Sequence, residues 1–188
     1  MKPLSIRKKA ILGILIASGV ATIVICCVMN FVLIPKIEAG NPPIHAFDMC
    51  TTGYTVEDAH AFVDWLSPEA KHVYLDVQLP LDFFYPIFYT LFFSFLWIVL
   101  HGKPNFFLAM PVGLAAADYV ENSLVIVMLK NPDFPRAVAR MASWATMFKT
   151  ALMYLTMLIL VIAIVVCILR AVRRKRQQKE TPDSPLGE

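Results

Sequence analysis

Two acidic side chains lie within a segment that is apolar enough to cross a membrane, residues 105–129. Asp118 and Glu121 are three residues apart there, and Asn122 follows directly. Residues three apart share one face of a helix, so the two carboxyl groups are expected side by side. Ionisable groups at membrane depth are costly and mark functional sites by default. Two carboxylates this close in a dry setting do not both ionise readily, so the pair predicts a shared proton or a bound cation.

Lys149 is the internal cation that the sequence offers to this pair. It lies early in the next apolar block, at the depth expected for Asp118 and Glu121. We therefore predict that the Lys149 ammonium group faces one of the two carboxylates. Asp82 and Tyr85 are predicted at the same depth, near the outer end of another apolar block. The sequence thus predicts a polar cluster or cavity in the outer half of the membrane domain.

This polar cluster admits several functions, which the sequence leaves open. Polar side chains between membrane helices often serve only as hydrogen-bonding contacts that fix the helix register. A cavity could also bind a lipid head group or a small ligand, with a predicted binding set of Asp82, Tyr85, Asp118, Glu121, Asn122, Lys149 and Tyr154. An intramembrane acid–base hydrolase would use paired carboxylates, and its candidate catalytic residues are Asp118, Glu121 and Asp82. A small oligomeric channel or proton-coupled carrier is the third alternative.

The non-enzymatic alternative is favoured because the usual catalytic groups are missing from the apolar blocks. The sequence has no Ser or Cys nucleophile paired with a membrane His, no His-rich metal box and no phosphate-binding glycine loop. No cofactor and no metal are predicted. Size weakens the carrier alternative, since four helices without an internal repeat would need to form a homo-oligomer to make a pathway.

Four apolar blocks must position these residues, at about 10–34, 82–101, 106–129 and 146–169. The chain has 188 residues, of which 58% are hydrophobic and 16% charged, whereas soluble domains average about 45–50% and 25%. Each block approaches or exceeds the ~20 residues that cross ~30 Å of hydrocarbon as a helix. The blocks predict an all-α fold: a four-helix transmembrane bundle in one domain, residues 1–175, with a small helical cap at 35–81. Pro35 is expected to end the first span and Pro80 to begin the second.

The basic residues predict the orientation of this bundle. They cluster at the two chain ends and in the short middle link, at Lys2, Arg7, Lys8, Lys9, Lys103, Arg170, Arg173, Arg174, Lys175, Arg176 and Lys179. Positive residues stay on the cytoplasmic side, so both termini are predicted to be cytoplasmic and the cap extracytoplasmic. Three basic residues near the third link go against this rule, Lys130, Arg136 and Arg140. Plasma membrane and endomembrane are not distinguished.

The basic tail also predicts a partner. Basic groups that directly abut a span bind anionic lipid heads, so membrane lipid is the expected partner. Nucleic acid is not expected, because no aromatic stacking pattern or folded basic surface accompanies the tail. Residues 176–188 are predicted to form a disordered cytoplasmic tail.

The cap segment predicts two short helices. Thr55 followed by Asp58 is a capping-box-like start for a helix at 56–66, and Ser67 before Pro68 starts another. The segment also holds two copies of one spacing, Glu57, His60, Asp64 and Glu69, His72, Asp76. Paired Glu-x-x-His motifs occur in di-iron bundles. Here the polar residues of the first copy oppose an apolar stripe, so we interpret them as a solvated face rather than as metal ligands.

Pro86 lies inside the second span and changes its hydrogen bonding. A proline within a helix leaves the carbonyl four residues earlier without its helical partner, here that of residue 82. Asp82, Tyr85 and this freed carbonyl are therefore predicted to lie together near the outer membrane boundary. The Asp82 carboxylate itself is explained by a place in the first helical turn, where the helix dipole favours a negative charge.

Two segments carry a resemblance to other proteins, Asp82-x-x-Tyr85-Pro86 and Asp118-Tyr119-x-Glu121-Asn122. Together with Gly53-Tyr54-Thr55-x-Glu57, they resemble a loosely defined group of uncharacterised small four-span membrane proteins. The resemblance covers roughly residues 50–135 and implies no activity. The general plan is also similar to four-span aspartate peptidases of the lipoprotein-signal-peptidase type, whose motifs are not matched here.

Overall fold

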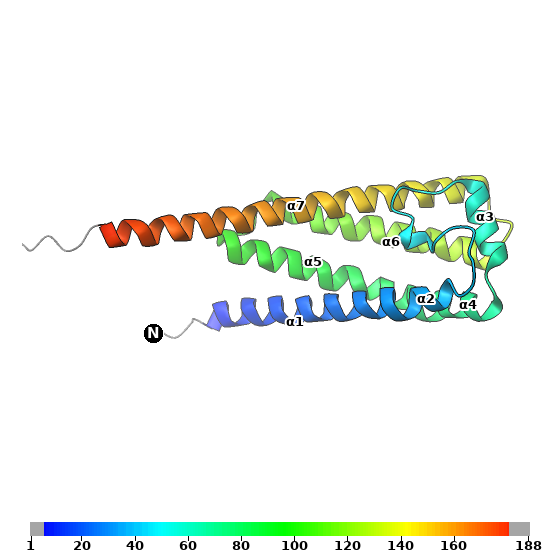
Figure 1. Cartoon of the computed structure of the whole chain (residues 1–188), viewed down its shortest axis with the longest axis horizontal. Helices are drawn as coiled ribbons and strands as arrows, with labels where there is room; N and C mark the ends of the chain where they lie inside the picture. Colours follow the sequence, from blue (N-terminus) through cyan, green and yellow to red (C-terminus); the bar gives the residue numbers. More distant parts are fainter. Residues whose placement is uncertain (1–5, 181–188) are drawn as a thin grey trace, which may run out of the picture.

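Long helices run side by side in this protein, and a short helical cap covers one end of them (Figure 1). The computed structural model describes residues 6–180, with side chains as far as Gln177. Four continuous helical segments are long and apolar enough to cross a membrane: Ile6–Ile37, Pro68–His101, Phe106–Lys130 and Arg136–Gln177. Within residues 6–180 there are helices and no β-strand, so the predicted all-α bundle is confirmed.

The first span continues past the proline that was expected to end it. Helix α1 (Ile6–Val28) passes through a π-helical segment (Met29–Leu33) into α2 (Ile34–Ile37). Pro35 lies in the first turn of α2. A proline is tolerated at such a position, because its missing N–H would have no regular partner after the wider π turn. The predicted end at residue 34 is therefore wrong, and the helix reaches Ile37.

The second span also begins earlier than predicted. Helix α4 (Pro68–Val73) continues through a second π-helical segment (Tyr74–Gln78) into α5 (Leu79–His101). Pro80 lies in the first turn of α5, directly after a π segment, as Pro35 does in the first span. The helix therefore continues through Pro80 without a break. The helix that contains Asp82 thus begins at Pro68. Asp82 lies in the interior of this helix, and its predicted interaction with a helix end is wrong.

The third span follows the prediction closely, and the fourth is much longer than predicted. Helix α6 (Ala109–Lys130) follows a short 3-10 turn at Phe106–Leu108, and α7 runs over Arg136–Glu180. At 1.5 Å per residue α7 is about 67 Å long, about twice the ~30 Å of a hydrocarbon core. Residues 176–180 are helical, so the predicted disordered tail is wrong for them, while 181–188 lie outside the described residues.

The four long helices form an open row rather than a closed bundle. Helix α1 packs mainly against α5, α5 against α6, and α6 against α7. Helices α1 and α7 are the two ends of this row, and across the described residues they share no extensive contact. Figure 1 shows α5 lying between them. The bundle therefore has one side, between α1 and α7, that its own helices do not close.

The cap is held on the bundle by its own apolar core. Helix α3 (Val56–Trp65) starts with the predicted capping box, in which Thr55 and Asp58 bind each other's backbone N–H groups. Ser67 caps α4 as predicted, by accepting a hydrogen bond from the Ala70 N–H. Phe47 and Phe62 of the cap are fully buried. They form one apolar core with fully buried residues at the neighbouring ends of α2, α5 and α6, which are Ile37, Leu79, Met128 and Leu129.

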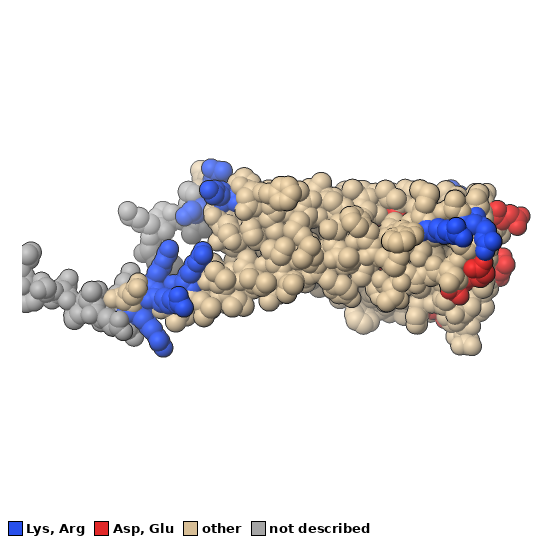
Figure 2. Space-filling model, turned by 90° about the horizontal axis from the view of Figure 1, so that it is seen from above, with Lys and Arg blue, Asp and Glu red and all other residues tan. Residues whose placement is uncertain are grey.

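Charged side chains gather at the two ends of the molecule, and the surface between them is formed mostly by other residues (Figure 2). Exposed apolar residues line this middle zone on all long helices, for example Ile23, Phe84, Val112, Phe148 and Val161. A soluble domain would bury such side chains, whereas lipid chains solvate them. The surface therefore agrees with four spans that cross one membrane.

Close packing of α1 on α5 depends on one glycine, and this gives a first testable prediction. A Cβ atom at Gly19 would lie 2.9 Å from the Phe92 ring, whereas one at Gly13 would meet nothing within 4 Å. Gly19→Leu is expected to lower the free energy of unfolding by about 1–3 kcal/mol, as overpacking does elsewhere. Thermal unfolding in one detergent measures this, with Gly13→Leu as the matched control. Equal melting temperatures for the two variants would contradict the packing.

Candidate functional site

The predicted charge cluster forms in the half of the long helices that lies next to the cap, around Lys149. The Lys149 Nζ atom lies 3.0 Å from Asp118 Oδ1 and also forms an ion pair with Glu121. Glu121 is fully buried, Asp118 nearly so, and only 16% of the Lys149 side chain is exposed. The prediction that Lys149 faces one of the two acids is confirmed, and it faces both. One cation thus neutralises one of two carboxylates that the fold has taken out of water.

Hydroxyl groups complete the coordination of these two carboxylates. Tyr89 of α5 donates a hydrogen bond to Asp118 Oδ2 at 3.1 Å. The Thr146 hydroxyl of α7 donates to the Glu121 carboxylate. Buried charges are tolerated when they are both paired and hydrogen-bonded, which is the case here. The cluster therefore ties α5, α6 and α7 together at one depth.

The carbonyl group that Pro86 frees has found a partner. Asn122 Nδ2 donates a hydrogen bond to the Asp82 carbonyl oxygen at 3.2 Å, and both residues are buried. Pro86 cannot donate to this carbonyl, so an amide side chain from α6 replaces the missing backbone bond. The carbonyl is free for a side-chain bond as predicted, although Asn122 was not predicted as its partner, and this bond links α5 to α6.

A cavity of about 220 Å³ lies beside the charge cluster, between the two ends of the helix row. Met29, Asn30 and Ile34 line it from the first span, and Thr150, Met153 and Tyr154 line it from α7. The remaining walls are Met49 of the cap and a set of polar side chains from the cap, α5, α6 and α7, which are Asp48, Thr51, Gln78, Asp82, Tyr85, Asp118 and Lys149. The open side of the bundle is therefore hollow and acidic at the end that lies next to the cap.

The predicted binding set is divided by this cavity. Five members line it: Asp82, Tyr85, Asp118, Lys149 and Tyr154. Glu121 and Asn122 are completely buried behind the lining, where they contact other protein groups. Tyr154 is 66% exposed, so only part of its side chain faces the cavity. The structure therefore brings the seven predicted binding residues together. Five of them line the cavity, and the other two bind protein groups behind its wall.

Sequence reasoning missed two cavity residues, Asp48 and Gln78. Asp48 lies in a short 3-10 turn of the cap, next to the fully buried Ala46 and Phe47, and Gln78 ends the second π segment. The sequence signal for Asp48 was its place beside the apolar residues Phe47 and Met49 within a loop, which indicates a carboxylate close to a buried segment. Both Asp48 carboxylate oxygens are enclosed. Burial raises the pKa of Asp48, and Asp118 raises it further, against the opposing effect of Lys149.

Several buried atoms of the cavity wall lack a hydrogen-bond partner among the described residues. They are both carboxylate oxygens of Asp48, Oδ2 of Asp82 and Oε1 of Gln78. Gln78 and Tyr74 lie beside Asp48 and influence its pKa, without reaching it at normal hydrogen-bond geometry. Unpartnered buried polar atoms are uncommon in native proteins and call for an unseen partner such as water, an ion or a ligand.

The two Glu-x-x-His copies of the cap do not meet. Glu57 forms an ion pair with Arg136. The His60 ring stacks on Phe134 with centroids 3.9 Å apart. In the second copy, His72 lies 2.6 Å from Asp76 of its own helix. Over the described residues, no group of three His, Cys, Asp or Glu side chains is placed to hold a metal ion.

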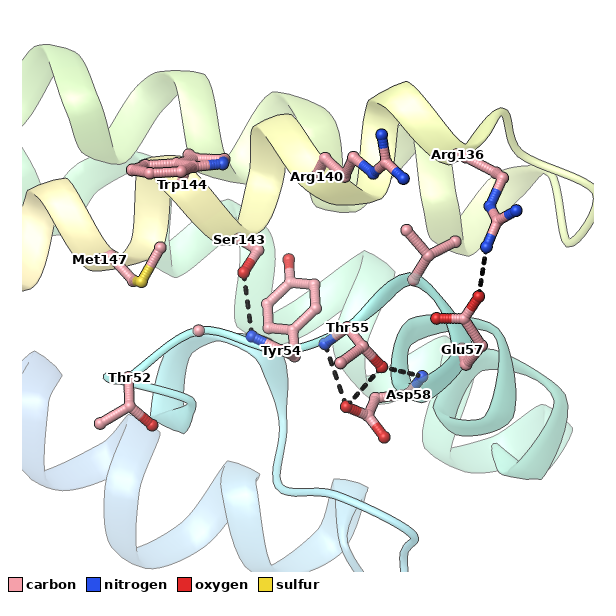
Figure 3. Close-up of a pocket in the computed structure, with 12 residues that line it drawn as sticks. Thr52, Tyr54, Thr55, Glu57, Asp58, Arg136, Arg140, Ser143, Trp144 and Met147 are labelled. Atoms are coloured by element: carbon pink, nitrogen blue, oxygen red, sulfur yellow. Dashed lines mark hydrogen bonds and ion pairs between the residues drawn. The ribbon is translucent and has the colours of Figure 1, made fainter.

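A second, wider hollow of about 550 Å³ lies where the cap meets α7 (Figure 3). Ser143 accepts a hydrogen bond from the Tyr54 N–H at 2.9 Å on one side of it, and Arg136 holds Glu57 on the other. The cap side of this hollow carries the acids Glu57 and Asp58, and the α7 side carries Arg136 and Arg140. The Asp58 carboxylate is already used by Thr55. This groove is a seam that docks the cap on α7, and its mixed charge selects no single class of ligand.

Comparison with known proteins adds no further constraint, since no family model, no curated protein and no solved structure matches the chain. The resemblance to small four-span membrane proteins stays a prediction. The function must therefore be argued from the cluster and the cavity alone.

Proposed function

We propose that this chain is a non-enzymatic multi-pass membrane protein that binds a lipid head group or a small ligand in the cavity between α1 and α7. The observation that carries this proposal is the cavity wall itself. It presents buried, unpartnered polar atoms of Asp48, Asp82 and Gln78 to a space of about 220 Å³. Keeping such groups unsatisfied lowers stability, and functional sites are where that is usually found.

The polar residues divide into two tasks. Asp118, Glu121 and Lys149 satisfy one another and stabilise the bundle. Asp48 and Asp82 face the cavity and do not contact Lys149 closely enough to pair with it. The hydrolase alternative needs a carboxylate that is free to exchange a proton. Asp118 and Glu121 are engaged by a lysine and two hydroxyl groups, so of the three candidate catalytic acids only Asp82 keeps an unpartnered carboxylate oxygen. The paired carboxylates that acid–base hydrolysis needs are therefore not both free, which favours binding over catalysis.

The open side of the helix row gives this ligand a path from the membrane. The lining changes from acids to Met29, Ile34 and Met153, which are apolar and belong to the two helices that border the gap. A lipid could place its head group against the acids while its chains stay between α1 and α7. Basic residues at the far end of α1 and α7 support an orientation with both termini cytoplasmic. The cavity then lies in the outer leaflet.

Filling the cavity without touching its acids tests the proposal. Thr150 lines the cavity, whereas the neighbouring Ala151 is exposed on the outer surface of α7. Wild type and Ala151→Phe are expected to retain one lipid or solute through purification in mild detergent, and Thr150→Phe to lose it. Native mass spectrometry measures the retained mass. Equal retention by Thr150→Phe and Ala151→Phe, with both variants folded, would contradict the cavity as the binding site.

A further inference from the structure

We infer that the ligand of this cavity carries a primary ammonium group, as an aminoethyl lipid head group or a free small amine does. This inference rests on the proposed binding function and names the chemistry of the ligand. It depends on which atoms the cavity leaves unsatisfied, on the charge balance around Lys149 and on the size of the space.

The unpartnered atoms of the cavity wall are all hydrogen-bond acceptors. Asp48 contributes two oxygens, and Asp82 and Gln78 one each. Asp82 and Gln78 are 3% and 1% exposed, so bulk water does not satisfy them. A complementary ligand must donate hydrogen bonds. An ammonium group has three N–H donors and no acceptor, which suits a cavity wall on which three side chains present unpartnered oxygens.

The charge balance points the same way. Lys149 lies among four acids at the cavity and the charge cluster, Asp48, Asp82, Asp118 and Glu121. Lys149 is already shared by Asp118 and Glu121. When Asp48 and Asp82 are ionised, a second cation beside them would bring the count closer to neutrality. Its binding would replace the proton that burial favours on Asp48. In a site with little water, such a cation is attracted far more strongly than in solution.

Size and wall chemistry favour an organic ammonium group over a bare metal ion. The volume of about 220 Å³ equals roughly seven water molecules at ~30 Å³ each, which is room for an aminoethyl phosphate group. Tyr85 and Tyr154 add aromatic carbon to the wall, and a cation can lie against an aromatic face. Direct metal coordination would instead require carboxylates that converge more closely.

A series of lipids that differ only in their N–H donors tests this inference. The probes are phosphatidylethanolamine, its N-monomethyl and N,N-dimethyl forms, phosphatidylcholine and phosphatidylglycerol, each added to delipidated protein in detergent and measured by native mass spectrometry. Affinity is expected to fall stepwise as N–H groups are replaced, by tenfold or more from the first to phosphatidylcholine. Phosphatidylglycerol is expected to bind as weakly as phosphatidylcholine. Displacement of the lipid by ethanolamine, and not by choline, would assign the same chemistry to a free amine.

Variants of the acids provide the second arm of this experiment. Asp82→Asn and Asp48→Asn are expected to remove the preference for phosphatidylethanolamine over phosphatidylcholine. Asp64→Asn changes an exposed acid of the cap and is expected to keep that preference. Lipid binding that Thr150→Phe abolishes, but that does not distinguish the N-methylated lipids, would overturn the amine inference and leave the proposed function intact. Binding of none of these probes, with the protein folded, would overturn both.

Discussion

Lys149→Met is expected to lower the free energy of unfolding by about 3–5 kcal/mol, the loss typical of breaking a buried ion pair from one side. The variant leaves Asp118 and Glu121 next to each other in a dry site without a cation. Both acids would have to take up a proton or draw water into the bundle. Thermal unfolding of the purified variant in the detergent used for wild type measures the loss.

Removing one acid is expected to have a smaller effect than removing the lysine. In Asp118→Asn the lysine keeps Glu121, and in Glu121→Gln it keeps Asp118, so each single variant retains one complete pair. The triple variant Lys149→Met, Asp118→Asn, Glu121→Gln contains no buried charge in the network and is expected to be more stable than Lys149→Met alone. Lys130→Met, at an exposed position, serves as the control. A Lys149→Met protein that melts like wild type would show that the network does not hold the bundle.

The central ion pairs of the site were predictable from the sequence because depth in a membrane is set by position in a span. Lys149 and the acids fall at matching distances from the ends of antiparallel helices, and a charge at that depth needs a partner. The carbonyl freed by Pro86 followed from backbone chemistry in the same way. Both predictions follow from helix geometry and from the unfavourable free energy of an unpaired charge or carbonyl group in lipid.

The cap residues of the site were not predictable by these rules. Asp48 reaches the cavity because a short turn folds it inward after the buried Ala46 and Phe47. Those two residues are held by contacts with helices distant in the sequence, which helix geometry alone does not predict. Helix ends were missed for a related reason. The π segments at Met29–Leu33 and Tyr74–Gln78 let helices pass Pro35 and Pro80, and a π turn has no strong sequence signature. Tertiary contacts therefore decided where the cap meets the bundle.

Gly53→Ala is expected to weaken the attachment of the cap to α7. Gly53 has φ +85°, a left-handed conformation that costs about 1–2 kcal/mol for a residue with a Cβ atom. That Cβ would also lie 2.8 Å from Ser143 Oγ and 3.0 Å from Met147 Sδ. The clash would add about 1–3 kcal/mol, as overpacking does in other cores.

Gly102→Ala separates the two contributions to this loss. Gly102 has a similar backbone angle, φ +78°, but a Cβ atom there would meet nothing within 4 Å. The difference between the melting temperatures of the two variants then reports the contact with α7 alone. Equal melting temperatures for Gly53→Ala and Gly102→Ala would show that the cap accommodates a methyl group at residue 53 without loss of stability.

The Gly53 contact also links the cap to the cavity, which gives the variant a second readout. The Tyr54 N–H, directly after Gly53, donates a hydrogen bond to Ser143 Oγ (Figure 3). A methyl group at Gly53 that moves Ser143 would break this bond, which holds the cap segment on α7. Asp48 precedes the same turn and lines the cavity. Displacing the turn is therefore expected to withdraw Asp48 and to reduce lipid retention in Gly53→Ala, while Gly102→Ala retains it. Loss of stability with full retention would mean that Asp48 stays in place through its contacts in the cap core, and that the docking seam and the cavity are independent.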